Sequence, residues 1–289
     1  MTDPGNPTAG PKVGRPLRVV ARGEVWKAVR ADLAEHGTAL VHADLADLEP
    51  DLPSGEELRE LLGRDWSRYL DLAHPEVRHR YAASRVLLKL AAGAVLNGDP
   101  NALELAYGPT GRPYLRGCDQ VDISLSHTDD LLLVGLTTRG LIGVDAERAD
   151  RPMYQRGLGR HVCTPYELVT LAALAEEERN PALVRLWTLK EAYSKAIGQG
   201  MQFSFTEFGF GPDGRPVRVQ RPDGSTGTGD EWGFHTFVLD SGYRISVAVY
   251  DAGFGTIGDM DMTTMLDPDC VDAIEHALRE GEGGGRGAT

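Results

Sequence analysis

The pattern of apolar and polar positions predicts a series of strands along the chain. In 121–126 apolar and polar residues alternate, and side chains two apart on a strand point to the same face, so this run is typical of a strand with one buried face. Similar strand-like runs occur in several further segments: 39–47, 131–137, 141–147, 233–239 and 243–250. Tight turns at Asp129-Asp130 and Arg139-Gly140 indicate that the three middle strands are neighbours.

Helical spacing of apolar residues fills the intervals between these strands. It extends over 56–72 and 76–96 before the middle strands, and over 165–178 and 181–197 after them. Gly198 is placed to end the last of these helices. The order of strand, helices and strands therefore occurs twice, which predicts an α+β fold with two similar halves.

The two halves are expected at 38–140 and 141–255. The segment 1–37 is an N-terminal extension whose start is rich in Pro, Gly and Thr, so we expect it to be partly disordered. The segment 256–289 is a tail with eight acidic and two basic residues that ends in a glycine-rich run. We expect the tail to be dispensable for activity, because it lies outside both halves.

Composition and charge exclude several classes of protein. The chain is 41% hydrophobic and 25% charged, as in globular proteins, and no run reaches the roughly 18 apolar residues that a membrane helix needs. Its net charge of −13 argues against a nucleic-acid-binding surface. The three cysteines are widely spaced, so neither a disulfide framework nor a thiolate zinc site is expected. Without a secretory signal pattern at the start, a reducing cytoplasm is the expected compartment.

Paired acidic residues close the strand predicted at 141–147. Asp145 and Glu147 are two apart, so their carboxylates share one face of the strand. Two adjacent carboxylates repel each other unless a cation neutralises them, and oxygen ligands suit Mg²⁺. Taken alone, the pair also fits a strand end with solvated acids.

Two further segments carry candidate chemistry. Glu191 and Lys195 are four apart on the predicted helix and so lie on one face of it, although a surface ion pair has the same spacing. Ser124 and Ser126 share a face of an earlier strand, and His127 follows where that strand ends. The ring N–H groups of this histidine would suit a phosphate, and they would equally suit a hydrogen-bonded position in a turn.

The order of these motifs resembles that of the 4′-phosphopantetheinyl transferases. The motifs are Gly-Arg-Pro (111–113), Ser-Leu-Ser-His (124–127), Gly-Val-Asp-Ala-Glu (143–147) and Trp-Thr-Leu-Lys-Glu-Ala-Tyr-Ser-Lys-Ala-Ile-Gly-Gln-Gly (187–200). The match covers about 38–250 and is closer to the monomeric, surfactin-synthetase-activating type. It implies a fold of two halves related by a pseudo-twofold axis, with the site at their interface.

The implied activity transfers 4′-phosphopantetheine from coenzyme A to a serine of an acyl or peptidyl carrier protein, leaving adenosine 3′,5′-bisphosphate. The resemblance implies Mg²⁺ as cofactor and carrier proteins of secondary metabolism, such as those of polyketide and non-ribosomal peptide synthesis, as partners. It also implies that the enzyme acts as a monomer, without nucleic acid or membrane.

The resemblance gives each matching side chain a role. The carboxylates that would hold Mg²⁺ are Asp145, Glu147 and Glu191. Glu191 would also take the proton of the carrier serine, or would orient the base that takes it. The resemblance therefore implies a catalytic group of Asp145, Glu191 and Lys195. The side chains that would contact the phosphates of coenzyme A are Lys195, Ser126, His127 and Arg112. Arg80 falls near the basic residues that receive the 3′-phosphate, and Arg85 is either a second candidate or a charge on the helix surface.

Two other functions compete with this interpretation. A metal-dependent nuclease also uses acids and a lysine, but it usually places an acid and the lysine two apart on a strand, unlike Glu191 and Lys195. A degenerate module that only binds carrier proteins would not need Asp145, Glu147, Glu191 and Lys195 to be intact.

Overall fold

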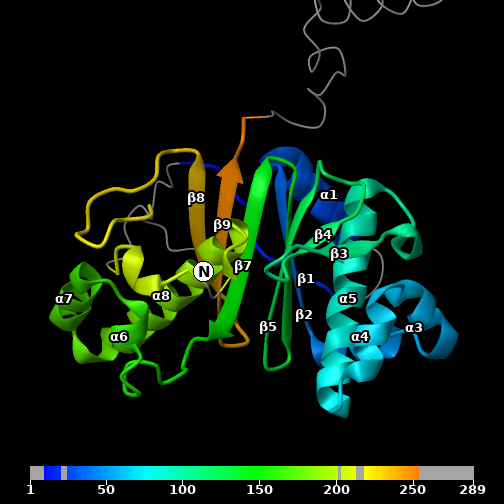
Figure 1. Ribbon diagram of the computed structural model, residues 1–289, viewed down its shortest axis with the longest axis horizontal. Coiled ribbons are helices and arrows are strands. Elements are labelled where there is room, and N and C mark those ends of the chain that lie inside the picture. Colours follow the sequence, from blue (N-terminus) through cyan, green and yellow to red (C-terminus); the bar gives the residue numbers. More distant parts are fainter. Residues whose placement is uncertain (1–9, 21–24, 201–202, 213–217, 254–289) are drawn as a thin grey trace, which may run out of the picture. The chain divides into compact units, whose positions relative to one another are not determined.

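The computed structural model describes residues 10–20, 25–200, 203–212 and 218–253. Two β-sheets form the centre of this part, and a long helix packs against each (Figure 1). The first sheet has the strand order β1 (Leu17–Arg18), β2 (Thr38–Asp44), β6 (Leu131–Thr137), β5 (Asp122–Thr128). The second has the order β7 (Gly140–Arg148), β9 (Tyr243–Asp251), β8 (Trp232–Val238). The acidic tail predicted at 256–289 lies outside the described residues.

The two sheets repeat the same topology. In the first half, β2 pairs antiparallel with β6, and β6 pairs antiparallel with β5. In the second half, β7 pairs antiparallel with β9, and β9 pairs antiparallel with β8. Each half therefore has one strand, a long helix and a hairpin whose last strand pairs with the first. This repetition confirms the prediction of an α+β fold with two similar halves.

The remaining elements connect or cover the sheets. The helices are α1 (Val25–His36), α2 (Leu45–Leu48), α3 (Gly55–Leu62), α4 (Asp65–Asp71), α5 (Pro75–Leu96), α6 (Gly159–Val162), α7 (Pro165–Ala173) and α8 (Glu176–Ala196). Short 3₁₀ turns lie at η1 (Glu49–Asp51), η2 (Pro100–Ala102) and η4 (Phe205–Glu207), and β3 (Leu105–Tyr107) pairs with β4 (Pro113–Leu115). None of the helices in the described part of the chain combines the length and the apolar character that crossing a membrane requires.

Two predicted helix boundaries are wrong. The helix expected over 56–72 is split into α3 and α4 at Gly63, whose φ of 55° lies in the left-handed region that glycine adopts readily. The break expected before Pro181 instead falls at Ala175, which has extended backbone. Helix α8 then begins with three glutamates, which the positive end of the helix dipole favours, and Pro181 lies inside it.

The segment before β2 is part of the fold, contrary to the prediction of an N-terminal extension outside the two halves. The carbonyl of Pro11 bonds to His235 on β8 (2.8 Å), and β1 then pairs parallel with β2. The following α1 packs on β2 and α5, with Val29 fully buried. Residues 10–18 thus run from the second sheet to the first as an extended strap, a conformation that proline and glycine allow. Residues 1–9 lie outside the described residues.

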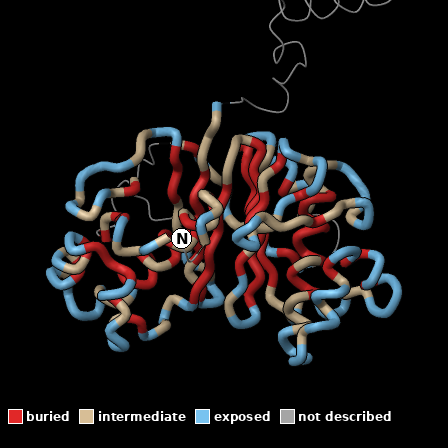
Figure 2. Tube along the Cα trace, in the orientation of Figure 1, coloured by how far each residue is buried: buried red, intermediate tan, exposed pale blue. Residues whose placement is uncertain are grey.

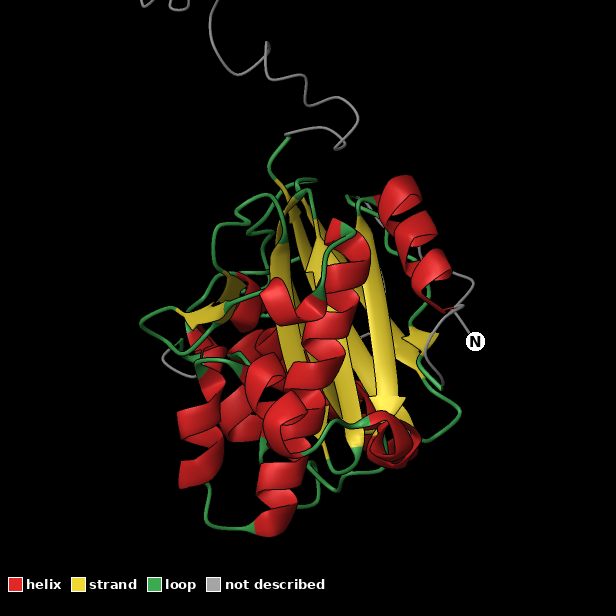
Figure 3. Ribbon diagram, turned by 90° about the vertical axis from the view of Figure 1, so that its right-hand side faces the viewer, coloured by secondary structure: helices red, strands yellow, loops and turns green. Residues whose placement is uncertain are grey.

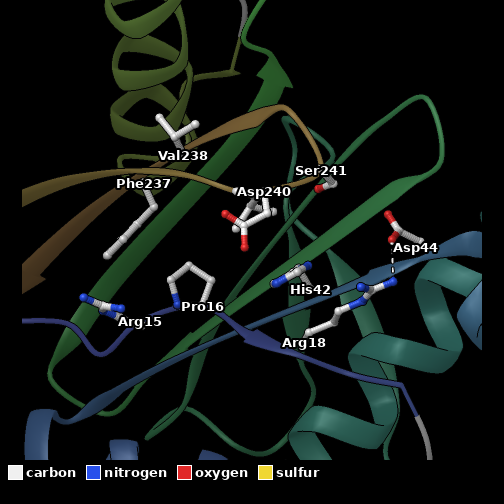
Figure 4. Close-up of a pocket in the computed structure, with 10 residues that line it drawn as sticks. Arg15, Pro16, Arg18, His42, Asp44, Phe237, Val238, Asp240 and Ser241 are labelled. Carbon is white, nitrogen blue, oxygen red and sulfur yellow. Dashed lines mark hydrogen bonds and ion pairs between the residues drawn. The ribbon is translucent and has the colours of Figure 1, made fainter. Parts of the chain in front are cut away.

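Four apolar clusters of buried residues make up the core of the described part, and the smallest of them lies between α3 and α5. Of the other three, one lies between α5 and the first sheet, and one lies between α8 and the second sheet. The third joins the sheets to each other through residues such as Leu40, Leu133, Val144 and Val247. Buried residues accordingly follow the central strands of both halves (Figure 2). Helices α5 and α8 lie on opposite outer sides of the two sheets (Figure 1), and the side view shows helices both to the left and to the right of the strands (Figure 3). A cavity of about 300 Å³ lies where the strap, β2 and the β8–β9 turn meet, and His42 lines it (Figure 4). In the described part of the chain, Nδ1 of His42 is buried and has no hydrogen-bond partner.

Candidate active site

Strands β5 and β7 lie against each other where the two sheets meet, and they are joined by side chains. Every second residue of β5 points toward β7. The Asp122 carboxylate accepts from the N–H of Ile142 (2.7 Å), the Ser124 hydroxyl accepts from the N–H of Val144 (3.1 Å), and the Thr128 hydroxyl donates to the carbonyl of Ala146 (2.6 Å). We call this line of contacts the seam. The polar positions of Asp-Ile-Ser-Leu-Ser-His-Thr therefore connect the two halves.

Ser126 continues the seam into a partly buried charged cluster. Its hydroxyl donates to Oδ1 of Asp145 (2.9 Å), and the ammonium of Lys195 donates to the same carboxylate oxygen (2.7 Å) and to the Ser126 hydroxyl (3.0 Å). Asp145 is only 7% exposed. The structure therefore brings together three of the predicted site residues, which come from three different elements.

Helix α8 supplies Glu191 and Lys195 because it packs very closely on β7. The contact point is Gly143, where a Cβ atom would overlap the carbonyl oxygen of Ala192. Only glycine permits this approach, which brings the face of α8 that carries Glu191 and Lys195 next to Asp145. Trp187 packs against Phe205 (ring centroids 5.6 Å apart) and against the core of the second half.

Lys190 anchors the same helix from inside the second half. Its ammonium is completely buried and donates to the carbonyls of Val162 (2.6 Å), Phe205 (2.7 Å) and Phe208 (2.7 Å) and to Oε2 of Glu167 (2.6 Å). These four acceptors come from the end of α6, the start of α7 and the segment around η4. Lys190 thus fixes three chain segments to α8 and leaves its neighbour Glu191 facing the cluster.

Glu191 is a partly buried carboxylate beside another acid. Burial and, next to it, the negative charge of Asp145 raise the pKa of Glu191 to about 7, while the positive charge of Lys195 opposes the rise. The two carboxylates thus repel each other in a partly dehydrated place. A divalent cation would relieve this repulsion, so Asp145 and Glu191 suit such an ion.

Glu147 departs from the expected arrangement. It lies on the same face of β7 as Asp145 and is buried, but its carboxylate bonds to the guanidinium of Arg151 and to the backbone N–H of Arg148 (2.9 Å). Within the described ranges, no three acidic, histidine or cysteine side chains converge closely enough to hold a metal ion. In this structure a nearby cation holds the carboxylate of Glu147, so its role as a third metal ligand beside Asp145 and Glu191 stays a prediction.

His127 lies among cations at the end of β5. Loss of solvent around the ring lowers its pKa, and the positive charges of Arg80, Lys195 and Arg85 lower it further. Among the residues that the structure describes, Nε of Arg80 is buried and has no hydrogen-bond partner. A cationic surface with an unused donor beside a neutral imidazole suits a phosphate group.

Arg85 has a different environment from Arg80. Its side chain is 11% exposed, and its guanidinium donates to the hydroxyl of Tyr107 (3.3 Å), lies over the ring of Tyr81 (4.1 Å) and faces Asp65 (3.5 Å). The interpretation of Arg85 as a charge on the helix surface is therefore wrong. Since its charge is already balanced by Asp65, Arg80 is the better phosphate candidate of the two.

Arg112 is placed at the start of the seam and not in the charged cluster. Its guanidinium donates to Oδ2 of Asp122 (2.5 Å) and to the carbonyl of Ile142 (2.8 Å). A contact of Arg112 with coenzyme A would require the pair with Asp122 to open, and it stays a prediction. The sequence analysis missed Asp122 as the partner, although its place two residues before Ser124 put it on the same strand face.

Comparison with known proteins gives a consistent result. The family model of the 4′-phosphopantetheinyl transferase superfamily matches 141–248, the half that contains Asp145, Glu147, Glu191 and Lys195. The 4′-phosphopantetheinyl transferase HetI of Nostoc is 30% identical over 185 residues, which cover 63% of this chain and 74% of HetI.

Other relatives match less of their own length or are more distant. The protein slr0495 of Synechocystis is 32% identical over 130 residues, which cover 44% of this chain and 52% of slr0495. The 4′-phosphopantetheinyl transferase Sfp of Bacillus subtilis is 21% identical over 183 residues, which cover 63% of this chain and 78% of Sfp. The match to HetI extends over most of that protein, and the family model covers the half with the charged cluster. The chain belongs to the 4′-phosphopantetheinyl transferase superfamily.

Proposed function

We propose that the protein transfers the 4′-phosphopantetheine arm of coenzyme A to a serine of an acyl or peptidyl carrier protein. The observation that carries this proposal is the partly buried cluster of Asp145, Glu191 and Lys195 at the seam. Two acids and an ammonium group from different elements converge there, next to the hydroxyl of Ser126 and the cationic surface around His127.

The reaction exchanges one phosphorus–oxygen bond for another. The serine oxygen of the carrier forms a bond to the β-phosphorus of coenzyme A, and the pyrophosphate bond to adenosine 3′,5′-bisphosphate breaks. We assign Asp145 and Glu191 to a magnesium ion, with Glu147 as a third ligand after its carboxylate leaves Arg151. Bound there, Mg²⁺ would neutralise the pyrophosphate oxygens.

The chain's own side chains bind and orient the substrates. Lys195 donates its ammonium protons toward the phosphates, and Ser126 and His127 contact them from β5. Arg80 receives the 3′-phosphate, because its unpaired Nε lies near His127. We assign Glu191 to take the proton of the carrier serine, or to orient the base that takes it, because this carboxylate would lie beside both the cation and the attacking hydroxyl.

We further propose the monomeric, surfactin-synthetase-activating type, working in the cytoplasm on carriers of polyketide or non-ribosomal peptide synthesis. Two similar halves in one chain support a monomer, because both sides of the seam are present without a second copy. Sequence similarity supports this subtype only weakly, since Sfp is 21% identical.

Mass spectrometry of purified apo-carrier proteins tests the proposal. After incubation with coenzyme A and Mg²⁺, we expect the mass of one phosphopantetheine arm to be added at the carrier serine. Asp145→Ala and Glu191→Gln should remove the transfer, while Arg148→Gln, a charge change outside the cluster, should retain it. Binding of the carrier without added mass would instead support a degenerate module, and cleavage of DNA or RNA would support a nuclease.

A further inference from the structure

The Glu147–Arg151 ion pair sits beside the proposed metal site and blocks its third ligand. Both carboxylate oxygens of Glu147 are in use: Oε1 accepts from the N–H of Arg148 (2.9 Å) and Oε2 accepts from the guanidinium of Arg151. The acid is 7% exposed at its side chain, whereas Arg151 is 41% exposed. A partly solvated cation therefore neutralises a buried acid.

Arg151 has both room to leave and an alternative environment. Glu147 and Arg151 line an open cavity of about 560 Å³ beside the end of β7, together with Asp129, Arg148 and Asp150. Arg148 already pairs with Asp150 at 2.9 and 3.1 Å, so it does not compete for Glu147 with its side chain. Asp129 lies on the exposed turn between β5 and β6. Its negative charge would attract the guanidinium of Arg151 after that group has left Glu147, in a place where water still reaches it.

We propose that Arg151 is a displaceable counter-ion, which holds Glu147 in the free protein and competes with the divalent cation for this carboxylate. This inference rests on the proposed magnesium-dependent function. The free protein then presents two carboxylates to a metal ion, and the third becomes a ligand only when Arg151 moves into the cavity. The affinity for the metal ion is therefore lower than it would be for the same three carboxylates without Arg151, because the metal ion must first displace Arg151 from Glu147.

The same competition acts on the other side of the cluster. The ammonium of Lys195 bonds to Asp145 (2.7 Å), just as Arg151 bonds to Glu147. An incoming metal ion would therefore compete with a positively charged side chain at both acids of β7. Phosphate groups would attract Lys195 away from Asp145, but they do not release Glu147. Arg151 therefore controls the metal affinity independently of the substrate, which makes it testable without coenzyme A.

The test measures the binding of Mn²⁺ to the full-length protein by electron paramagnetic resonance, with no coenzyme A or carrier present. Arg151→Gln should bind Mn²⁺ about three- to fivefold more tightly than the wild type, which is the upper part of the range that removal of a partly exposed ion pair gives. Arg148→Gln is the matched control. It removes the same charge three residues away but leaves the side-chain partner of Glu147 in place, so its affinity should change less than about twofold.

A second pair of variants shows whether Arg151 acts through Glu147. In a Glu147→Gln background, adding Arg151→Gln should leave Mn²⁺ affinity unchanged. An equal gain in that background, or an equal gain from Arg148→Gln, would mean a general charge effect and would overturn the inference. Failure of both wild type and Arg151→Gln to bind Mn²⁺ would also overturn it. The proposed function is judged separately, by transfer to the apo-carrier.

Discussion

Replacing Glu191 by Gln should stabilise the protein at alkaline pH while it removes transfer activity. The carboxyl group of Glu191 titrates at its ordinary value of 4.5 in the unfolded chain, but its pKa rises to about 7 in the folded protein. Above about pH 7 the folded state must therefore carry a charge that its surroundings disfavour. Glutamine keeps the shape of the side chain and carries no charge.

The magnitude follows from this change in pKa. A rise from 4.5 to about 7 corresponds to about 3 kcal/mol of unfolding free energy, which is fully present below pH 4.5 and is lost as the pH rises to about 7. Since the side chain of Glu191 is partly exposed, solvent reduces this to about 1–2 kcal/mol. For a domain of this size we expect the melting temperature of Glu191→Gln to rise by about 2–6 °C at about pH 8.5, and by clearly less at about pH 5.5.

Thermal unfolding in the presence of a chelator measures this effect without metal ions. Glu147→Gln is the control, because its carboxylate is paired with Arg151 and its removal should leave the melting temperature unchanged or lower it. A lower melting temperature for Glu191→Gln at about pH 8.5, or the same gain at both pH values, would refute the interpretation that Glu191 is a destabilising charge beside Asp145.

Three further changes test how the site is supported. Lys190→Met should cost about 3–5 kcal/mol in urea unfolding, because Glu167 would stay buried without its cation; a cost under about 1 kcal/mol would contradict the anchoring role. Gly143→Ala should cost about 2–3 kcal/mol and slow the transfer, because the added methyl overlaps the carbonyl of Ala192; normal kinetics would show that α8 need not pack so closely. Arg112→Ala should lower the free energy of unfolding by about 2 kcal/mol, and unchanged coenzyme A affinity in calorimetry would remove its predicted substrate contact.

Periodicity and short motifs were sufficient to predict the strands and helices that carry the site. Residues two apart on β7 and four apart on α8 were placed on common faces, and the structure shows Asp145 next to Lys195. The spacing of residues within one strand or helix is enough for this prediction, because the geometry of the element fixes which side chains share a face. The repeated order of elements likewise predicted the two similar halves.

Contacts between distant segments could not be predicted in the same way. Arg85 is buried because Asp65 on α4 and Tyr107 on β3 both reach it, and no local pattern brings those segments together. The partner of Glu147 lies in an irregular loop after β7, where no periodicity places a side chain. The N-terminal segment was misread for another reason. Its prolines and glycines predicted disorder, and the helical spacing of Val25, Val29 and Leu33, which would have indicated α1, was missed.

Lys190 shows that the Trp-x-x-Lys-Glu-Ala-x-x-Lys signature contains residues of two kinds: some hold the fold together, and others lie in the candidate active site. Its first lysine is entirely dehydrated inside the second half, whereas its second lysine touches the acid on β7. A relative that had lost the reaction but kept the fold would be expected to retain Trp187 and Lys190, and so to score well in a motif search. Activity among such relatives is therefore better diagnosed from Glu191 and Lys195 than from the signature as a whole.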